Sequence, residues 1–147
     1  MNNIYLGFKG QNNSSAILVN SLSGQKSLLT NSFAGLKRDI DKLPVDYESV
    51  FLFGVEKNLT DSFRIEQCAE KEGVWLTTTL DLKAVSDNFA AAGVKSSISK
   101  SPTQYLCNEA YWHLLKKYDG RAVLIHIPTV KNFKSIFEKT TFPEKLI

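Results

Sequence analysis

Cys107 is the residue of this 147-residue chain whose type and position best suit a nucleophile. It lies near the first turn of a predicted helix, whose apolar stripe is Leu106, Ala110, Leu114 and Tyr118. The partial positive charge of a helix start stabilises a thiolate, so this position predicts a pKa for Cys107 below the usual value of a thiol. Free cysteines are also often fully buried, which leaves a small core residue as the alternative.

His126 interrupts an otherwise apolar strand, residues 122–127, which Pro128 closes. An imidazole in a buried strand needs a hydrogen-bond partner or a chemical task, and a core histidine with a satisfied partner is the more common case. The helix of Cys107 directly precedes this strand. A right-handed crossover between parallel strands would bring the start of that helix to the carboxyl edge of the sheet. We therefore expect the thiol and the imidazole to lie close together.

A carboxylate, Glu66, lies upstream within the half-apolar stretch 63–67. Such a group could orient a histidine and fix its tautomer. Its position alone favours an exposed side chain on an edge strand. Cys68 and His113 are the rival thiol and imidazole. No helix start activates Cys68, and the mid-helix position of His113 favours a structural role.

The elements that must position these side chains alternate between strands and helices. Apolar runs predict strands at residues 4–8, 27–30, 49–55, 63–67, 74–76, 94–98 and 122–127. Helical spacing predicts helices at residues 33–43, 82–92, 106–118 and 133–137, whereas residues 16–19 fit a strand or a helix. Asn31 or Ser32 is the predicted N-cap of the first of these helices, and Thr79 that of the second. This order predicts an α/β fold: a single three-layer domain over residues 1–147, with a mostly parallel sheet and helices on both faces.

The composition excludes several classes of protein. The 18 Lys+Arg and 15 Asp+Glu give a net charge of +3, spread along the chain, which does not indicate nucleic-acid binding. The longest apolar run, residues 50–55, is too short to cross a membrane, and the N-terminus lacks a secretory pattern. Two cysteines are typical of free thiols, so we expect a cytoplasmic protein. Neither zinc-ligand spacing nor a phosphate-binding glycine loop occurs, so we expect no metal and no cofactor.

The second half of the chain resembles the pyroglutamyl peptidase I family, or pyrrolidone carboxyl peptidases, which are cysteine peptidases. The stretch LTTTLDLKA at residues 76–84 is similar to the family's STLP-(I/V)-KA segment. The stretch SKSPTQYLCN at 99–108 resembles its S-N-T-A-G-T-(F/Y)-x-C-N segment, and LIHIP at 124–128 resembles F-I-H-(V/I)-P. Upstream, EQCA at 66–69 resembles E-R-x-A, and YLGFKG at 5–10 resembles T-G-F-x-P-F-G-G.

The resemblance implies a role for five residues. Cys107 would be the nucleophile, His126 the general base and Glu66 the residue that orients it. Phe8 matches an aromatic residue that flanks the flat lactam ring, and Tyr105 matches the aromatic position before the nucleophile, so both are candidate substrate-binding residues. The implied fold is the pyroglutamyl-peptidase/phosphorylase-like α/β fold. The implied reaction is that of a thiol protease of the omega peptidase type: hydrolysis of N-terminal pyroglutamate from a small blocked peptide through a thioester acyl-enzyme.

Other segments depart from the family pattern. Gln11 stands where the family has its second opening Phe, and residues 54–59 lack the Gln and the later glycines of G-Q-A-G-G-R. The sequence therefore leaves three functions open: a pyroglutamyl peptidase, another small-amide or thiol hydrolase using the same three residues, and a catalytically altered or inactive binding protein. Assembly into a homo-oligomer stays open.

Overall fold

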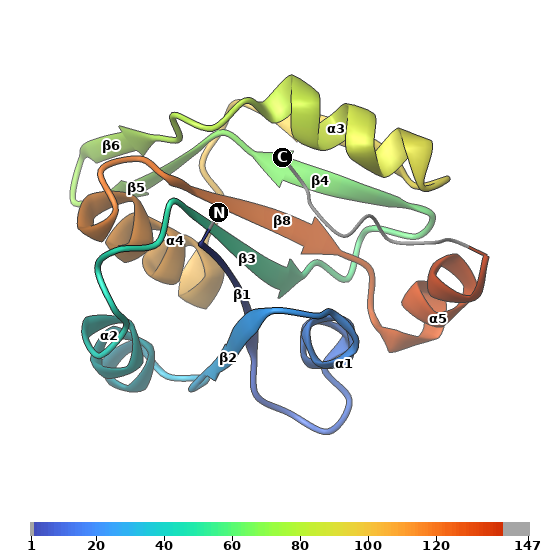
Figure 1. The fold of residues 1–147 in the computed structure, drawn as a ribbon, viewed down its shortest axis with the longest axis horizontal. Helices are drawn as coiled ribbons and strands as arrows, with labels where there is room; N and C mark the ends of the chain where they lie inside the picture. The colour runs from blue at the N-terminus through green and yellow to red at the C-terminus, as the bar shows by residue number, and fades with distance from the viewer. Residues whose placement is uncertain (1, 140–147) are drawn as a thin grey trace.

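A six-stranded sheet forms the middle layer of the protein (Figure 1). The computed structural model describes residues 2–139. The strands of this sheet are β1 (Asn3–Phe8), β2 (Gln25–Leu29), β3 (Ser49–Val55), β4 (Ser62–Glu66), β7 (Lys95–Ser99) and β8 (Ala122–Ile127). Their order across the sheet is β2-β1-β3-β8-β4-β7, so β3 and β8 are central. Both are buried along nearly their whole length, as their continuous apolar sequences predict.

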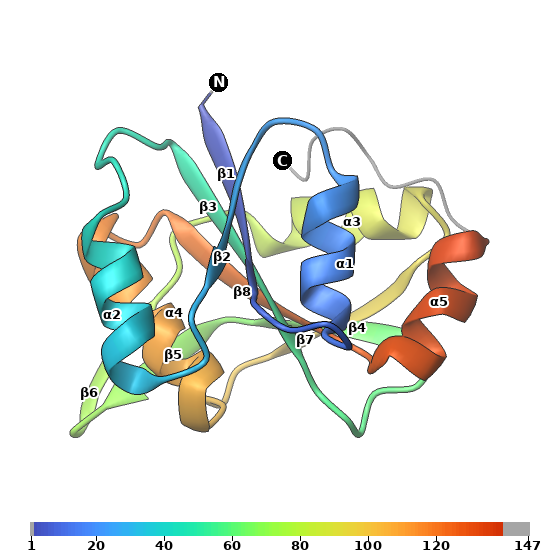
Figure 2. The same ribbon diagram turned by 90° about the horizontal axis from the view of Figure 1, so that it is seen from below.

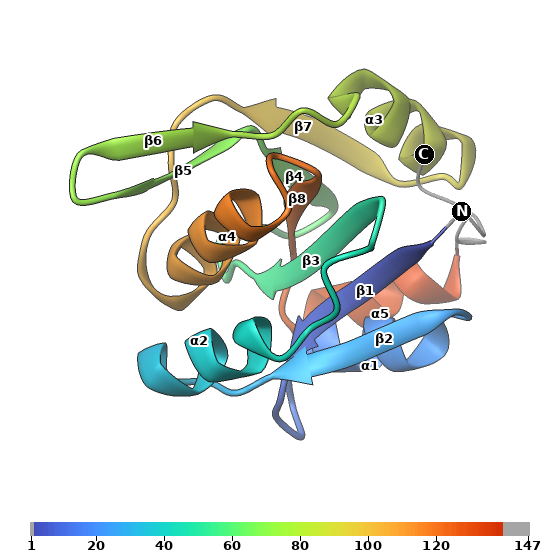
Figure 3. The same ribbon diagram turned by 60° about the vertical axis from the view of Figure 1, so that its left-hand side comes forward.

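The sheet is mostly parallel, and the exception is the pairing of β4 with β8, which is antiparallel. Strand β7 is parallel to β4 and so also runs opposite to β8. The expected crossover between parallel strands ahead of His126 is therefore wrong, because the strand before the Cys107 helix runs the other way. Residues 100–104 instead carry the chain from the end of β7 back to the start of that helix (Figure 3).

Helices cover both faces of the sheet, which confirms the three-layer α/β fold (Figure 2). Helices α2 (Phe33–Asp41) and α4 (Tyr105–Lys117) pack on one face. Helices α1 (Ser14–Ser21), α3 (Leu82–Ala91) and α5 (Val130–Glu138) pack on the other. None of these helices within residues 2–139 is long and apolar enough to cross a membrane.

Residues 16–19, which fit either a strand or a helix by sequence, belong to α1. The side chain of Asn13 caps this helix by accepting the N–H of Ser15 at 3.0 Å. Gly7 in β1 allows α1 to approach the sheet, because a Cβ there would lie 2.8 Å from the carbonyl oxygen of Ser15. The side-chain cap and this close approach favour a helix over a further strand.

Asp81, not Thr79, caps α3. The Asp81 carboxylate accepts the N–H of Ala84 at 3.0 Å, and Asp81 directly precedes the first helical residue, which is the position of an N-cap. Thr79 lies too far upstream to reach the helix, so the prediction of a Thr79 cap is wrong. The predicted Ser32 cap of α2 is confirmed, since its hydroxyl accepts the N–H of Gly35 at 3.0 Å.

A small hairpin, β5 (Cys68–Lys71) and β6 (Val74–Thr77), lies outside the main sheet and packs against α4 (Figure 3). The side chain of Asn108 accepts the backbone N–H of Glu70 at 3.1 Å and donates to its carbonyl at 2.7 Å. The hairpin directly follows β4 in the chain. The helix that carries Cys107 is therefore fixed against the segment that follows β4.

We expect Asp81→Ala to lower the free energy of unfolding by about 1 kcal/mol, because it removes the side-chain partner of a helix N–H. Urea unfolding followed by circular dichroism measures this change. Asp81→Asn keeps a capping oxygen and should cost much less, and Thr79→Val removes a hydroxyl that caps nothing. A larger loss from Thr79→Val than from Asp81→Ala would contradict the assignment of the cap.

Candidate active site

Glu66 and His126 form a buried pair across two neighbouring strands. Arg64 of β4 lies opposite His126 of β8, and Glu66 lies opposite Leu124, so Glu66 and His126 are diagonal neighbours on one face of the sheet. His126 Nδ1 lies 2.9 Å from Glu66 Oε2, and the two side chains are 2% and 1% exposed. The expectation of an exposed edge position for Glu66 is wrong, because β4 is paired on both sides. When Nδ1–H donates to the carboxylate, Nε2 is the basic nitrogen.

Arg64 supplies a positive charge to this pair. Its Nε donates to Glu66 Oε2 at 2.6 Å, and its Nη2 lies 3.5 Å from His126 Nδ1 and 3.9 Å from Glu56 Oε2. Burial alone would raise the pKa of Glu66, but the hydrogen bonds from His126 and Arg64 outweigh it and hold that pKa below its usual value. Glu66 is therefore ionised near neutral pH and holds His126 in one tautomer.

The thiol of Cys107 lies over Gly54, beside the ring of His126. Gly54 of β3 pairs in register with His126, on the side of β8 away from β4. A Cβ at Gly54 would lie 2.6 Å from Cys107 Sγ and 3.5 Å from His126 Nε2. The distance between Cys107 Sγ and His126 Nε2 is therefore at most the sum of these two distances. The thiol and the imidazole lie close together, as the sequence predicts.

Burial of the thiol raises the pKa of Cys107, to about 12. The carboxylates of Glu56 and Glu66 add to this rise, and a hydrogen bond from the backbone of Val55 lowers the pKa by less. The expectation of a low pKa at the helix start is therefore wrong, because the loss of water around the sulfur and the two carboxylates disfavour the thiolate. The resting group is a neutral thiol near pH 7, so a base must take its proton before it attacks a substrate.

The first turn of α4 has backbone N–H groups that no side chain caps. Tyr105 has φ of 63°, in the left-handed region, where a non-glycine residue costs about 1–2 kcal/mol. Gln104, the N-cap, makes no side-chain hydrogen bond to the helix. The N–H groups of Leu106 and Cys107 therefore have no side-chain cap and face the end of the helix. Such groups can bind a negatively charged oxygen.

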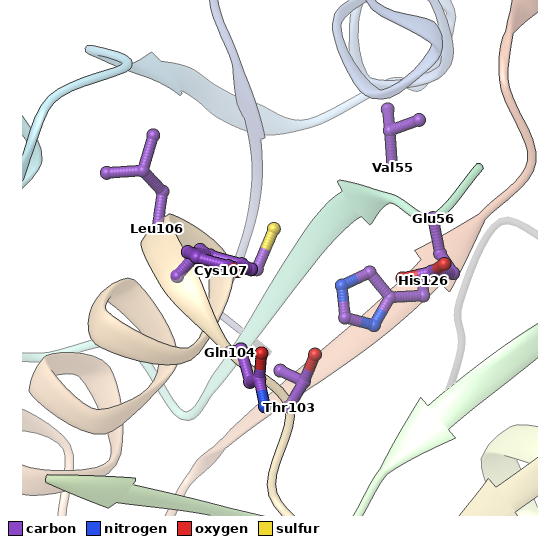
Figure 4. Close-up of a pocket in the computed structure, with 8 residues that line it drawn as sticks. Val55, Glu56, Thr103, Gln104, Leu106, Cys107 and His126 are labelled. Atoms are coloured by element: carbon purple, nitrogen blue, oxygen red, sulfur yellow. The ribbon is translucent and has the colours of Figure 1, made fainter. Parts of the chain in front are cut away.

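A pocket of about 350 Å³ opens beside the thiol (Figure 4). Its lining comes from the end of β3, the entry to α4 and the end of β8: Val55, Glu56, Thr103, Gln104, Tyr105, Leu106, Cys107 and His126. This volume lies at the small end of the range for small-molecule sites. Within residues 2–139, no three histidine, cysteine or acidic side chains gather as a metal ion would need.

The remaining sequence candidates lie in different surroundings. Phe8 is buried in the core beneath α2 and α4 and is not among the residues that line the pocket, so its role in substrate binding stays a prediction. Tyr105 does line the pocket and is 80% exposed. Cys68 is buried and donates to a backbone carbonyl at 3.3 Å. His113 pairs along α4 with Glu109 at 2.9 Å, outside the pocket lining.

The sequence reasoning missed several residues of the site, among them Arg64, Glu56, Thr103 and Gln104. Arg64 could have been identified from the sequence, because residues two apart on a strand share a face and Arg64 is two residues before Glu66. Glu56 could also have been identified, because it follows the carboxyl end of a buried strand, where α/β folds commonly bind their ligands. Thr103 and Gln104 lie on the segment that returns from β7 to α4, and their place depends on the antiparallel direction of β7.

Comparison with solved structures shows the fold of pyrrolidone carboxyl peptidases. A mutant (E192I) pyrrolidone carboxyl peptidase from the hyperthermophile Pyrococcus furiosus is 18% identical, with a TM-score of 0.75 over 97% of this chain and 88% of that chain. The enzyme from Thermococcus litoralis is 19% identical, with a TM-score of 0.70 over 87% and 77% of the two chains. That from Thermus thermophilus is 18% identical, with a TM-score of 0.69 over 86% and 84%.

Sequence comparisons find less. No protein-family model matches this chain, and no curated protein matches it. The fold that the resemblance in sequence motifs implies is confirmed by the structural comparison, because this chain and the pyrrolidone carboxyl peptidases superpose over most of their lengths. What this chain does with the fold is a separate question that depends on its own residues.

We expect Gly54→Ala to displace the thiol of Cys107, because the added methyl carbon would lie 2.6 Å from its sulfur. The expected loss in the free energy of unfolding is about 1–3 kcal/mol, measured by urea denaturation. The same substitution in a Cys107→Ala background removes the sulfur and should cost clearly less. An equal cost in both backgrounds would show that the sulfur is not what limits position 54.

The raised pKa of Cys107 predicts slow alkylation near pH 7 and a rate that climbs with pH. The thiolate forms only as pH rises toward the pKa of about 12, so the rate should increase about tenfold per pH unit from pH 7 to 10. Iodoacetamide labelling of a Cys68→Ser variant, followed by mass spectrometry, measures Cys107 alone. A plateau reached below pH 8 would contradict the raised pKa.

Proposed function

We propose that this protein is a cysteine peptidase that removes N-terminal pyroglutamate from peptides. One observation carries the proposal: the Glu66 carboxylate bonds to His126 Nδ1, while Nε2 of the same ring and the Cys107 sulfur both lie beside Gly54. A nucleophile, a base and an orienting acid in this order are what acyl transfer requires. The fold shared with pyrrolidone carboxyl peptidases supports this class of reaction over others.

In the proposed first step, Cys107 Sγ attacks the carbonyl carbon of the pyroglutamyl residue and its proton passes to His126 Nε2. Because the resting thiol is neutral, proton transfer accompanies the attack. The carbonyl oxygen becomes negative and lies at the start of α4, where the N–H groups of Leu106 and Cys107 can donate to it. Glu66 stabilises the imidazolium that forms.

In the second step, the bond between carbonyl carbon and leaving nitrogen breaks, and His126 Nε2 returns its proton to that nitrogen. The shortened peptide departs with a free amino group, and pyroglutamate stays bound to Cys107 as a thioester. Water then attacks the thioester carbon while His126 takes one of its protons. The C–S bond breaks, the sulfur regains a proton, and free pyroglutamate is released.

The pocket supports a small, neutral acyl group. Its volume of about 350 Å³ lies at the small end of the range for small-molecule sites, which suits a small acyl group beside the thiol. The side-chain amide of Gln104 offers both a donor and an acceptor, which is the pattern needed to pair with the C=O and N–H of a lactam. Tyr105 supplies an exposed aromatic face at the rim, in keeping with its predicted role in substrate binding.

A binding protein that retains the fold without turnover is the second candidate. The observation that favours it is the raised pKa of Cys107, since an unreactive resting thiol is what an inactive relative would have. The two candidates differ in one measurable property. The peptidase releases the leaving amine in a reaction that needs Cys107, whereas the binding protein releases none.

We expect wild-type protein to hydrolyse a fluorogenic pyroglutamyl amide, and Cys107→Ala and His126→Ala each to abolish the release of fluorophore. Glu66→Gln should lower kcat/KM by about 10²-fold or more, because an amide holds the imidazole without a full negative charge beside it. Thermal unfolding of each variant checks that it is folded. Full activity in folded Cys107→Ala would contradict the mechanism, and no release from folded, reduced wild type would favour the binding protein.

A further inference from the structure

Glu56 is a carboxylate in the wall of the pocket that the proposed reaction does not use. It follows β3 directly, its backbone N–H donates to the carbonyl of Ile127 at 2.9 Å, and it lines the same pocket as Cys107 and His126. Its side chain is 23% exposed, so it is partly desolvated yet open to a ligand. The negative charge of Glu56 opposes thiolate formation at Cys107. A positive charge bound beside Glu56 would reduce this effect.

The hydrogen-bonding capacity of this carboxylate is only partly used. Its Oε1 accepts the backbone N–H of Asn58 at 3.2 Å. Its nearest cation, Arg64, has Nη2 at 3.9 Å from Oε2, which is too long for a hydrogen bond, and Arg64 Nε is already bonded to Glu66 at 2.6 Å. Glu56 can therefore accept a further charge-assisted hydrogen bond from a ligand.

The place of Glu56 relative to His126 decides which part of a substrate it faces. His126 must protonate the leaving nitrogen, so the leaving residue lies on the His126 side of the sulfur. Glu56 is on that side: its backbone bonds to the residue that follows His126, and Arg64 contacts both side chains. In Figure 4 Glu56 is drawn beside His126, with Cys107 across the pocket.

We propose that Glu56 selects substrates whose leaving residue carries a positively charged side chain, arginine or lysine, next to the pyroglutamyl group. This inference rests on the proposed function and names its substrate class. A guanidinium or ammonium group would bond to Glu56 Oε2, in a partly buried site where such a bond is stronger than in open water. Binding the correct substrate would neutralise Glu56 and remove one cause of the raised pKa of Cys107. The same contact would thus bind the substrate and favour formation of the thiolate.

The test compares two peptides that differ only in charge, pyroglutamyl-arginine amide and pyroglutamyl-citrulline amide. Citrulline keeps the length and shape of arginine but is neutral. In wild-type protein, kcat/KM for the arginine peptide should exceed that for the citrulline peptide by about tenfold. Glu56→Gln should reduce this ratio to near one, and 0.5 M salt should weaken it in wild type. A ratio near one in wild type, or an unchanged ratio in Glu56→Gln, would overturn the proposal.

Glu48→Gln is the matched control. Glu48 and Glu56 flank β3 at its two ends, and Glu48 is exposed at the amino end, away from the pocket. The control removes the same charge from the protein without touching the site, so its ratio should equal that of wild type. Loss of the preference in Glu48→Gln as well would assign it to the overall charge of the protein and would overturn the role of Glu56.

A second measurement keeps the role of Glu56 testable if neither peptide is cleaved, an outcome that would count against the proposed function itself. In a Cys68→Ser background, Cys107 is alkylated with 2-bromoethylammonium, a cation, and with 2-bromoethanol, its neutral counterpart. The ratio of the two rates should fall about fivefold or more in Glu56→Gln relative to wild type and to Glu48→Gln. Equal ratios in all three proteins would overturn a cation site at Glu56.

Discussion

The hydrogen bond between Glu66 and His126 is the constraint on which the site depends. A carboxylate that is only 1% exposed is strongly destabilised unless it is paired and hydrogen-bonded, and Arg64 and His126 together meet that need. His126 comes within reach because β4 runs antiparallel beside β8 in a register that places Arg64 opposite His126 and Glu66 on the diagonal. Arg64 lies two residues before Glu66, on the same face of β4. The one reversal in an otherwise parallel arrangement is thus the feature that assembles the acid and the base.

The nucleophile is placed by a different set of contacts. Helix α4 is held by the β5–β6 hairpin through Asn108, and its first turn lies over Gly54, near the carboxyl end of the central strand β3. This position shields the sulfur from much of the solvent, although Cys107 keeps some exposure to the pocket, and the shielding makes the free thiolate unfavourable. The same burial strengthens every charge interaction in the pocket. A charge that a ligand brings close to the thiol would therefore act on it more strongly than in open water.

The fold was largely predictable because the sequence patterns are strong. The apolar runs of β3 and β8, and the helical stripe of α4, predict their elements nearly to the residue. The direction of β4 and β7 was not predictable in this way, since strand polarity depends on which partners meet in the folded chain and leaves no local pattern. The burial of Glu66 and the path of the segment before α4 follow from that direction, so both were missed.

The electrostatics of the site were predicted least well. The helix start above Cys107 is a local feature and was found from sequence, but the pKa of Cys107 depends on burial and on Glu56 and Glu66, which come from other strands. Phe8, whose motif suggests a role in substrate binding, packs in the core beneath α2 and α4, and that role stays a prediction.

The residue type at position 54 is informative when related sequences are compared. A Cβ at position 54 would lie 2.6 Å from the sulfur of Cys107, so a side chain at this position is incompatible with the present place of the thiol. A related chain with cysteine and histidine at the matching places but a larger residue at this one must hold its thiol elsewhere. A single small residue, with no chemistry of its own, therefore distinguishes chains that keep this geometry from chains that keep only its reactive side chains.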